Sequence, residues 1–200
     1  MPGRRLFVAV PLPAGVRDDI VALVDRVRRS EAVASASAGA SAQEVRWVRM
    51  DGLHLTLRFL GPTLDERLPP LEAAIRAAAR AAAPFPVRIA GGGAFPNPDR
   101  PRVLWLGVTD GADGLATLAR ALEEGLGAAG WPRGDRPFRA HLTLARSDGV
   151  KAGPETAHAL TVAAERFAAE FTADRLVLFE SHTGGGPARY EALLEVPLSG

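Results

Sequence analysis

The stretch His54-Leu55-Thr56-Leu57 recurs as His141-Leu142-Thr143-Leu144, and this repeated tetrapeptide decides the fold that we expect. Successive side chains of a β-strand point to opposite faces of the sheet. In each copy the histidine and the threonine therefore share one face, about 6–7 Å apart along the strand, and the leucines share the other. The sequence predicts two strands whose leucines lie in the core and whose histidine–threonine pairs form polar faces.

Further strands and helices surround both copies of the motif. Alternating or β-branched segments predict strands at 5–10, 45–49, 53–60, 86–91, 102–108, 137–146, 174–180 and 190–196. Apolar residues at helical spacing predict helices near 14–30, 66–83, 113–129 and 155–170. The low-complexity segment 31–42 is expected to be a flexible insertion.

The order of these elements repeats along the chain. A strand and a helix precede each motif strand, which suggests two similar lobes that each contribute one motif. We expect a bilobal α+β fold, in which each lobe is an antiparallel sheet with helices packed outside and a central cleft carries both motifs. The length of 200 residues suits a single domain over 1–200.

Composition narrows the functional classes. The chain is 47% hydrophobic, has no cysteine and carries a formal net charge of +1. Disulfides, zinc–thiolate sites and a thiol nucleophile are therefore excluded. No apolar run approaches the roughly 20 residues that span a bilayer. We expect a cytoplasmic monomer without a membrane segment or an obligate protein partner.

The motif histidines, His54 and His141, are the candidate catalytic residues. Imidazole titrates near pH 6.5, so one ring can accept a proton while the other donates one. Displacement at a phosphodiester uses both, because a proton leaves the attacking oxygen and another reaches the departing oxygen. The hydroxyls of Thr56 and Thr143 suit the non-bridging phosphate oxygens. The motif lacks the further carboxylate and histidine ligands of metal-dependent nucleases, so we predict acid–base catalysis with no metal and no cofactor.

Arginines near the motifs are candidate substrate-binding residues, because the planar guanidinium matches phosphate. Strict alternation places Arg58 and Arg139 on the faces of the motif histidines. The same alternation places Arg146 on the face opposite to His141.

Other histidines and aromatic residues are weaker candidates. His158 and His182 have no threonine two residues further on, and we expect surface or loop roles for them. Phe95, Phe138 and Tyr190 have the flat rings that stack on nucleobases. Aromatic residues near strands usually belong to the core, and we expect this of Phe138.

Segments that span nearly the whole chain resemble a known family. The matching pieces are 5–13, 47–61, 137–146, 176–181 and 186–190. Together they resemble the RNA 2′,3′-cyclic phosphodiesterases, LigT-like members of the two-histidine phosphoesterase superfamily that were historically called 2′-5′ RNA ligases. The resemblance implies that the partner is RNA with a 2′,3′-cyclic phosphate end, which is hydrolysed to a 2′-phosphate. It also implies that the reverse reaction, 2′-5′ ligation, uses the same groups.

The resemblance further implies roles for individual residues. His54 would be the general acid that protonates the departing 3′ oxygen, and His141 would be the general base that activates water. Thr56 and Thr143 would hold the phosphate, and Arg146 would help to bind the substrate. Because alternation points Arg146 away from His141, a bulge or the end of the strand must turn it inward.

Two alternative functions keep part of this interpretation. The same site would suit a related substrate, such as a small cyclic nucleotide or a 2′-5′ oligonucleotide. A non-catalytic protein that binds RNA ends would use the motifs only to grip the phosphate. Rates compared across these substrates, and binding without product formation, distinguish the three hypotheses.

Overall fold

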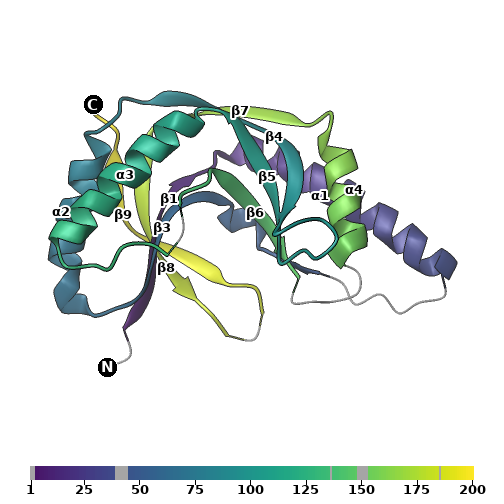
Figure 1. The fold of residues 1–200 in the computed structure, drawn as a ribbon, viewed down its shortest axis with the longest axis horizontal. Coiled ribbons are helices and arrows are strands. Elements are labelled where there is room, and N and C mark those ends of the chain that lie inside the picture. The colour runs from purple at the N-terminus through teal and green to yellow at the C-terminus, as the bar shows by residue number, and fades with distance from the viewer. Residues whose placement is uncertain (1–2, 39–44, 136, 148–152, 185) are drawn as a thin grey trace.

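Two antiparallel sheets covered by helices make up the chain, which confirms the predicted α+β class (Figure 1). The structure is a computed structural model that describes residues 3–38, 45–135, 137–147, 153–184 and 186–200. The first sheet has the order β3-β1-β8-β9 and comprises β1 (Arg4–Pro11), β3 (His54–Thr63), β8 (Arg175–His182) and β9 (Arg189–Pro197). The second has the order β2-β6-β5-β4-β7 and comprises β2 (Arg46–Trp47), β4 (Phe85–Phe95), β5 (Val103–Asp110), β6 (His141–Arg146) and β7 (Ala168–Ala173).

Each lobe combines segments from both halves of the chain. Helix α1 (Ala14–Ala38) follows β1 of the first sheet, yet it packs against α4 (Gly153–Ala164) and β7 of the second. Helix α3 (Ala112–Ala128) follows β5 of the second sheet, yet it packs against α2 (Leu68–Ala79) and β3 of the first. Figure 1 shows α2 and α3 on the left and α1 and α4 on the right. The two lobes therefore do not coincide with the two repeated halves of the sequence.

Several element boundaries differ from those expected. Helix α4 ends at Ala164 rather than near 170, because Ala168–Ala173 alternates exposed and buried residues and forms β7. Helix α1 continues to Ala38, so the expected flexible insertion at 31–42 is helical as far as 38, and its remainder lies outside the described residues. Alanine is the strongest helix former, which explains the extension. Strand β6 begins at His141 rather than 137.

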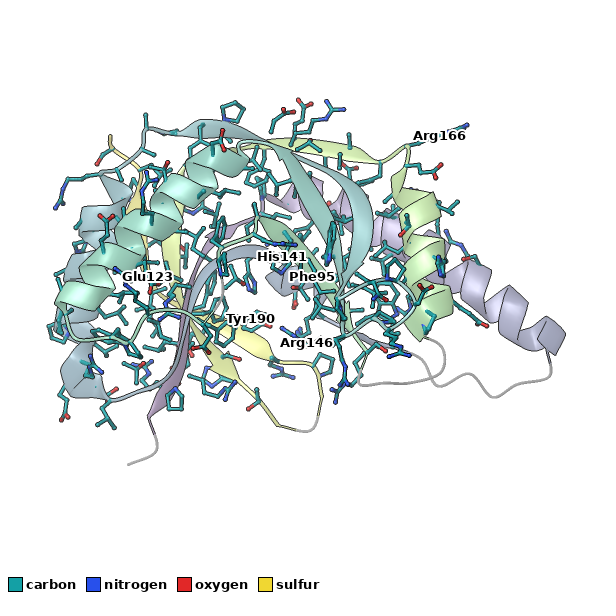
Figure 2. All side chains as sticks on the ribbon, in the orientation of Figure 1. Phe95, Glu123, His141, Arg146, Arg166 and Tyr190 are labelled. Atoms are coloured by element: carbon teal, nitrogen blue, oxygen red, sulfur yellow. The ribbon has the colours of Figure 1, made fainter. Side chains whose placement is uncertain are left out.

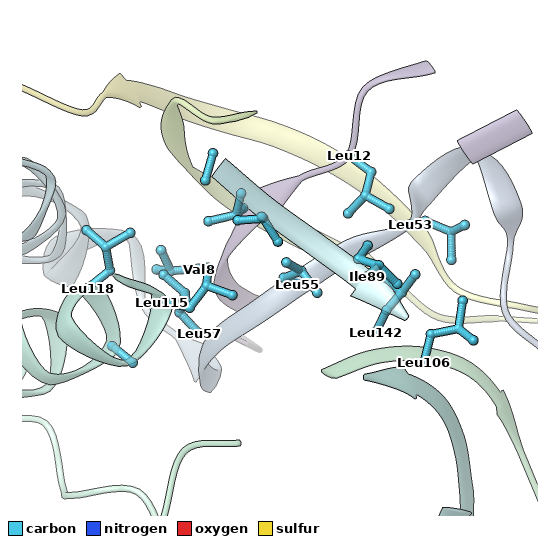
Figure 3. Close-up of a cluster of buried hydrophobic side chains, with 14 of the residues drawn as sticks. Val8, Leu12, Leu53, Leu55, Leu57, Ile89, Leu106, Leu115, Leu118 and Leu142 are labelled. Carbon is cyan, nitrogen blue, oxygen red and sulfur yellow. The ribbon is translucent and has the colours of Figure 1, made fainter. Parts of the chain in front are cut away.

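Buried hydrophobic side chains of both lobes form one cluster (Figure 3). The motif leucines belong to it, with exposed fractions of 1% for Leu55, 7% for Leu57 and 0% for both Leu142 and Leu144. Burial of one leucine stabilises the fold by about 1.5–3 kcal/mol, so both motif strands are firmly anchored. This confirms the predicted inner face of the motif. Strands β3 and β6 also contact each other, although they belong to different sheets.

None of the described helices combines the length and the apolar character needed to cross a membrane. Two short 3₁₀ turns, Met50–Gly52 and Asp65–Arg67, flank β3. The first of these turns leads directly into the first motif and contributes to the site.

Candidate active site

The two motif histidines are held in the same way. The Nδ1 atom of His54 lies 2.7 Å from the carbonyl oxygen of Gly52, and that of His141 lies 2.7 Å from the carbonyl oxygen of Arg139. A carbonyl oxygen only accepts hydrogen bonds, so Nδ1 carries the proton and donates in both rings. The Nε2 atom of each ring is left to accept a proton when the ring is neutral and to donate one when it is charged.

The first motif strand bulges directly after its threonine. The register with β1 steps from Thr56 to Arg58 and leaves Leu57 without a paired residue. A bulge reverses the alternation of the residues that follow it. Phe59 consequently shares the side of His54 and Thr56, and the simple alternation that assigned this face to Arg58 was wrong.

The second motif strand bulges at the equivalent position. The register with β5 steps from Thr143 to Ala145 and leaves Leu144 without a paired residue. Ala145 is buried and Arg146 is exposed, as the reversed alternation requires. Arg146 can share a face with His141 only if the strand bulges between them, and the structure contains this bulge.

Two adjoining pockets open beside the motif faces. The small pocket, of about 60 Å³, is lined by Phe7, Val48, Gly52, Leu53, His54, Thr56, Phe59, Thr143, Arg146 and Tyr190. The larger one, which we call the groove, has a volume of about 830 Å³ and is lined by Thr56, Leu57, Arg58, Phe59, Ala116, Ala119, Arg120, Glu123, Arg133, Gly134, Asp135, Pro137, Phe138, Arg139, His141, Thr143 and Arg146. Both threonines and Arg146 line both spaces. The structure thus brings every predicted site residue to one or both of two neighbouring pockets.

Aromatic rings enclose His54. Its ring centroid lies 4.6 Å from that of Phe7, 5.0 Å from that of Tyr190 and 5.9 Å from that of Phe179. This burial lowers the pKa of His54 below its usual value, and the hydrogen bond to the Gly52 carbonyl only partly opposes the effect. The neutral ring is therefore favoured in the free protein.

His141 lies in a more open place. Among the described residues, its one aromatic neighbour is Phe95, whose ring meets it edge-on at a centroid distance of 5.2 Å. The ring of Phe95 packs in turn on Trp105 at 5.1 Å. Figure 2 shows His141, Phe95, Arg146 and Tyr190 gathered toward the middle of the molecule.

The sequence did not identify Gly52 as part of the site, and it did not place Tyr190 beside a motif histidine. A Cβ atom on Gly52 would lie 2.7 Å from Cδ2 of Tyr190, so only glycine lets the tyrosine ring pack here. Burial raises the pKa of the Tyr190 phenol, and the charge of Arg146 acts in the opposite direction. A glycine two residues before a motif histidine was the available signal. Nothing in the sequence pairs it with a tyrosine 138 positions later.

Arg58 lines the groove but is engaged by the protein. Its Nε atom lies 2.9 Å from Oε2 of Glu123, and its guanidinium donates a hydrogen bond to the carbonyl oxygen of Pro132. Oε1 of Glu123 accepts a hydrogen bond of 2.8 Å from the backbone N–H of Gly134. These contacts tie β3 to α3 and to the loop that follows α3.

The remaining predicted candidates lie in different surroundings. The side chain of Arg139 is exposed in the groove, where Phe138 is half-buried and packs against the core. His158, on α4, lies 3.4 Å from Asp99 and lines neither pocket.

A group of possible metal ligands lies outside both pockets. Ligand atoms of Glu180, His182 and Glu191 fall within 4.8 Å of one another, the one such group among the described residues. Glu180 already accepts two hydrogen bonds from Arg4, and His182 lies 3.2 Å from Glu191. The exposed position of His182 agrees with the surface role expected for it.

Sequence comparisons relate the chain to proteins with a named activity. A family model described as the 2′-5′ RNA ligase superfamily matches residues 16–185. An RNA 2′,3′-cyclic phosphodiesterase of Methanothermobacter thermautotrophicus is 33% identical over 147 residues, which cover 74% of this chain and 73% of the relative. A protein of the same name from Escherichia coli K12 is 30% identical over 191 residues, which cover 95% of this chain and 94% of the relative.

Structural comparisons extend the likeness to the whole fold. The crystal structure of E. coli LigT complexed with 3′-AMP matches with a TM-score of 0.73 and 28% identity, and the match covers 100% of both chains. E. coli LigT in its apo form matches with a TM-score of 0.67 and 25% identity over the same shares.

Proposed function

Because the chain belongs to the 2′-5′ RNA ligase superfamily, we propose that it is a phosphodiesterase that hydrolyses RNA 2′,3′-cyclic phosphate ends to 2′-phosphate ends. One observation carries the proposal beyond family membership. Two histidines with Nδ1 fixed as a donor reach neighbouring pockets that share two threonines and an arginine. This arrangement supplies two proton-transfer groups and three phosphate ligands without any further component.

In the proposed reaction, water attacks phosphorus in line with the departing 3′ oxygen. Nε2 of His141 accepts the proton of the water, and Nε2 of His54 donates a proton to the 3′ oxygen. The bond from phosphorus to the 3′ oxygen breaks, and the phosphate stays on the 2′ oxygen. Thr56, Thr143 and Arg146 bind the non-bridging oxygens and stabilise the charge that grows on them.

The burial of His54 adds a step to this sequence. A general acid must carry a proton, whereas burial favours the neutral ring in the free protein. The phosphodiester is negatively charged, and an opposite charge within about 4–6 Å favours the protonated form. His54 therefore takes up its proton as the substrate binds, and substrate affinity falls as the pH rises.

The comparisons favour this function over the two alternatives. Relatives that are 33–38% identical to the chain over aligned stretches of 142–153 residues are named RNA 2′,3′-cyclic phosphodiesterases, which supports an enzyme rather than a protein that only binds RNA ends. E. coli LigT has been crystallised with 3′-AMP, a nucleotide that has phosphate at its 3′ end. This supports a pocket for a terminal nucleotide in the same fold.

The test incubates the chelator-treated protein with a short RNA that ends in a 2′,3′-cyclic phosphate. We expect a product heavier by one water, with its phosphate on the 2′ oxygen. Phosphate on the 3′ oxygen would contradict the proposed leaving group. Absence of any product between about pH 5 and 8, where imidazoles titrate, would contradict the enzyme.

A further inference from the structure

The groove is much larger than the chemistry at phosphorus requires. The small pocket, at about 60 Å³, has the volume of roughly two waters and takes phosphate oxygens but no nucleoside. The groove, at about 830 Å³, lies near the upper end of the volumes of ligand pockets, about 300–1,000 Å³. Of these two pockets, only the groove has room for a nucleoside and for more of an RNA strand.

Three exposed arginines that the proposed reaction does not use converge on this groove. Arg120 lies on α3, Arg133 lies in the loop after α3, and Arg139 lies just before β6. None has an ion pair or a side-chain hydrogen bond within the described parts of the chain. Guanidinium groups without protein partners are available to phosphates.

The loop that carries Arg133 is fixed on both sides of it. Pro132 accepts the hydrogen bond from Arg58, and Gly134 donates its hydrogen bond to Glu123. Glu123 is thus committed to Arg58 and to the loop, which leaves Asp135 as the one other carboxylate among the described residues that line the groove. The balance of charge that faces the groove is positive.

From these observations we propose that the groove binds the RNA chain on the 5′ side of the cyclic phosphate, with Arg120, Arg133 and Arg139 on its backbone phosphates. The inference rests on the proposed function and narrows its substrate to a strand of several nucleotides. In a 2′,3′-cyclic end the 5′ oxygen of the terminal ribose is the one link to the rest of the strand. A mononucleotide lacks the phosphates that these arginines would bind.

The experiment compares two substrates that have the same reacting group. One is adenosine 2′,3′-cyclic monophosphate, and the other is a six-nucleotide RNA that ends in the same cyclic nucleotide. The variant Arg120→Ala/Arg133→Ala removes two of the three proposed phosphate ligands and leaves the motifs intact. The control Arg76→Ala/Arg80→Ala removes the same charge from α2 and its end, where both residues are exposed and line neither pocket.

We expect the wild-type protein to have a higher kcat/KM for the hexamer than for the mononucleotide. The kcat/KM of the groove variant should fall about tenfold on the hexamer, which is the scale of two exposed charge contacts, and should stay within about twofold of wild type on the mononucleotide. The slope of log kcat/KM for the hexamer against log salt should become shallower by about 0.7 for each phosphate that no longer meets an arginine. The control should match wild type on both substrates.

Two results would overturn the inference and leave the proposed function standing: equal kcat/KM of the wild type on both substrates, or equal losses of the groove variant on both. Turnover of neither substrate by the wild type would instead overturn the proposed function, and the inference with it.

Discussion

The two motif strands have the same tetrapeptide, the same bulge after the threonine and the same Nδ1 hydrogen bond, yet their surroundings differ. Around His54, rings from β1, β8 and β9 exclude water and lower its pKa. Around His141, one phenylalanine edge leaves the ring open to the groove. The position five residues after each histidine differs as well, with Phe59 on one strand and Arg146 on the other.

Two different causes determine the environment of each histidine. The repeated sequence and its local hydrogen bonds set the backbone and the tautomer of each histidine. The neighbouring strands, which do not repeat, decide how much each ring is solvated and which group stands beside it. Equivalent backbones thus become a chemically unequal pair.

The largest expected effect tests whether the two histidines act as one unit. His54→Ala and His141→Ala should each lower kcat on a cyclic RNA end by about 10²–10⁴-fold. The double variant should be little worse than either single variant, because acid and base serve the same transition state. Steady-state kinetics with circular dichroism as a check of folding would measure this, with His158→Ala as a control at wild-type activity. Losses that multiply in the double variant would contradict a concerted pair.

A smaller effect is expected at the unequal positions Phe59 and Arg146. Arg146→Ala should lower kcat/KM by about 10–100-fold, because a hydrogen bond to a charged group is worth about 1.5–3 kcal/mol. Arg146→Lys should recover part of the loss, since the charge stays and the planar donor fork is removed. Phe59→Ala should lower kcat/KM by about tenfold or less, which is the value of one stacking contact between an aromatic side chain and a base. Equal losses at both positions would show that the asymmetry has no role in binding phosphate.

The next prediction concerns the packing of Gly52 against Tyr190. Gly52→Ala should lower kcat by about tenfold, because the new Cβ displaces the tyrosine ring or the carbonyl that orients His54. In a Tyr190→Leu background, Gly52→Ala should lower kcat much less, because the tyrosine ring that the new Cβ would meet is absent. A full additional loss in that background would locate the effect in the backbone of the turn. Kinetics of the two single variants and the double variant complete the cycle.

The smallest effect is a shift in titration. NMR should find the pKa of His54 below 6.5, and Tyr190→Leu should raise it toward 6.5 because water gains access to the ring. The folded protein binds this proton less readily than the unfolded chain does. The free energy of unfolding should therefore decrease as the pH falls below about 6.5 toward the folded-state pKa, and this decrease should be weaker in the variant. A His54 that titrates at or above 6.5 in the wild type would contradict the enclosure.

The sequence predicted what depends on local spacing. The buried leucines and the shared face of each histidine and threonine follow from a period of two, and the structure contains both. Strand β7 was missed because its alanines suit a helix as well as a strand. The bulges at Leu57 and Leu144 were not predictable from alternation, which assumes an unbroken ladder. They decide that Phe59 rather than Arg58 shares the motif face.

The surroundings of the site were less accessible from the sequence. The enclosure of His54 depends on Phe7, Phe179 and Tyr190, which come from three strands. Their pairing is set by sheet order, and no local pattern encodes it. The crossing of α1 and α3 to the opposite sheets was hidden for the same reason.

Because α1 and α3 cross to the opposite lobes, the two halves of the chain are interlaced. A cut between the repeated halves would leave each fragment with a helix whose supporting sheet belongs to the other fragment. The buried hydrophobic residues of the two halves form one cluster, so such a cut would also divide the core that anchors both motif strands. On heating, we therefore expect the site and the fold to be lost in one cooperative transition, with no folded half that keeps activity.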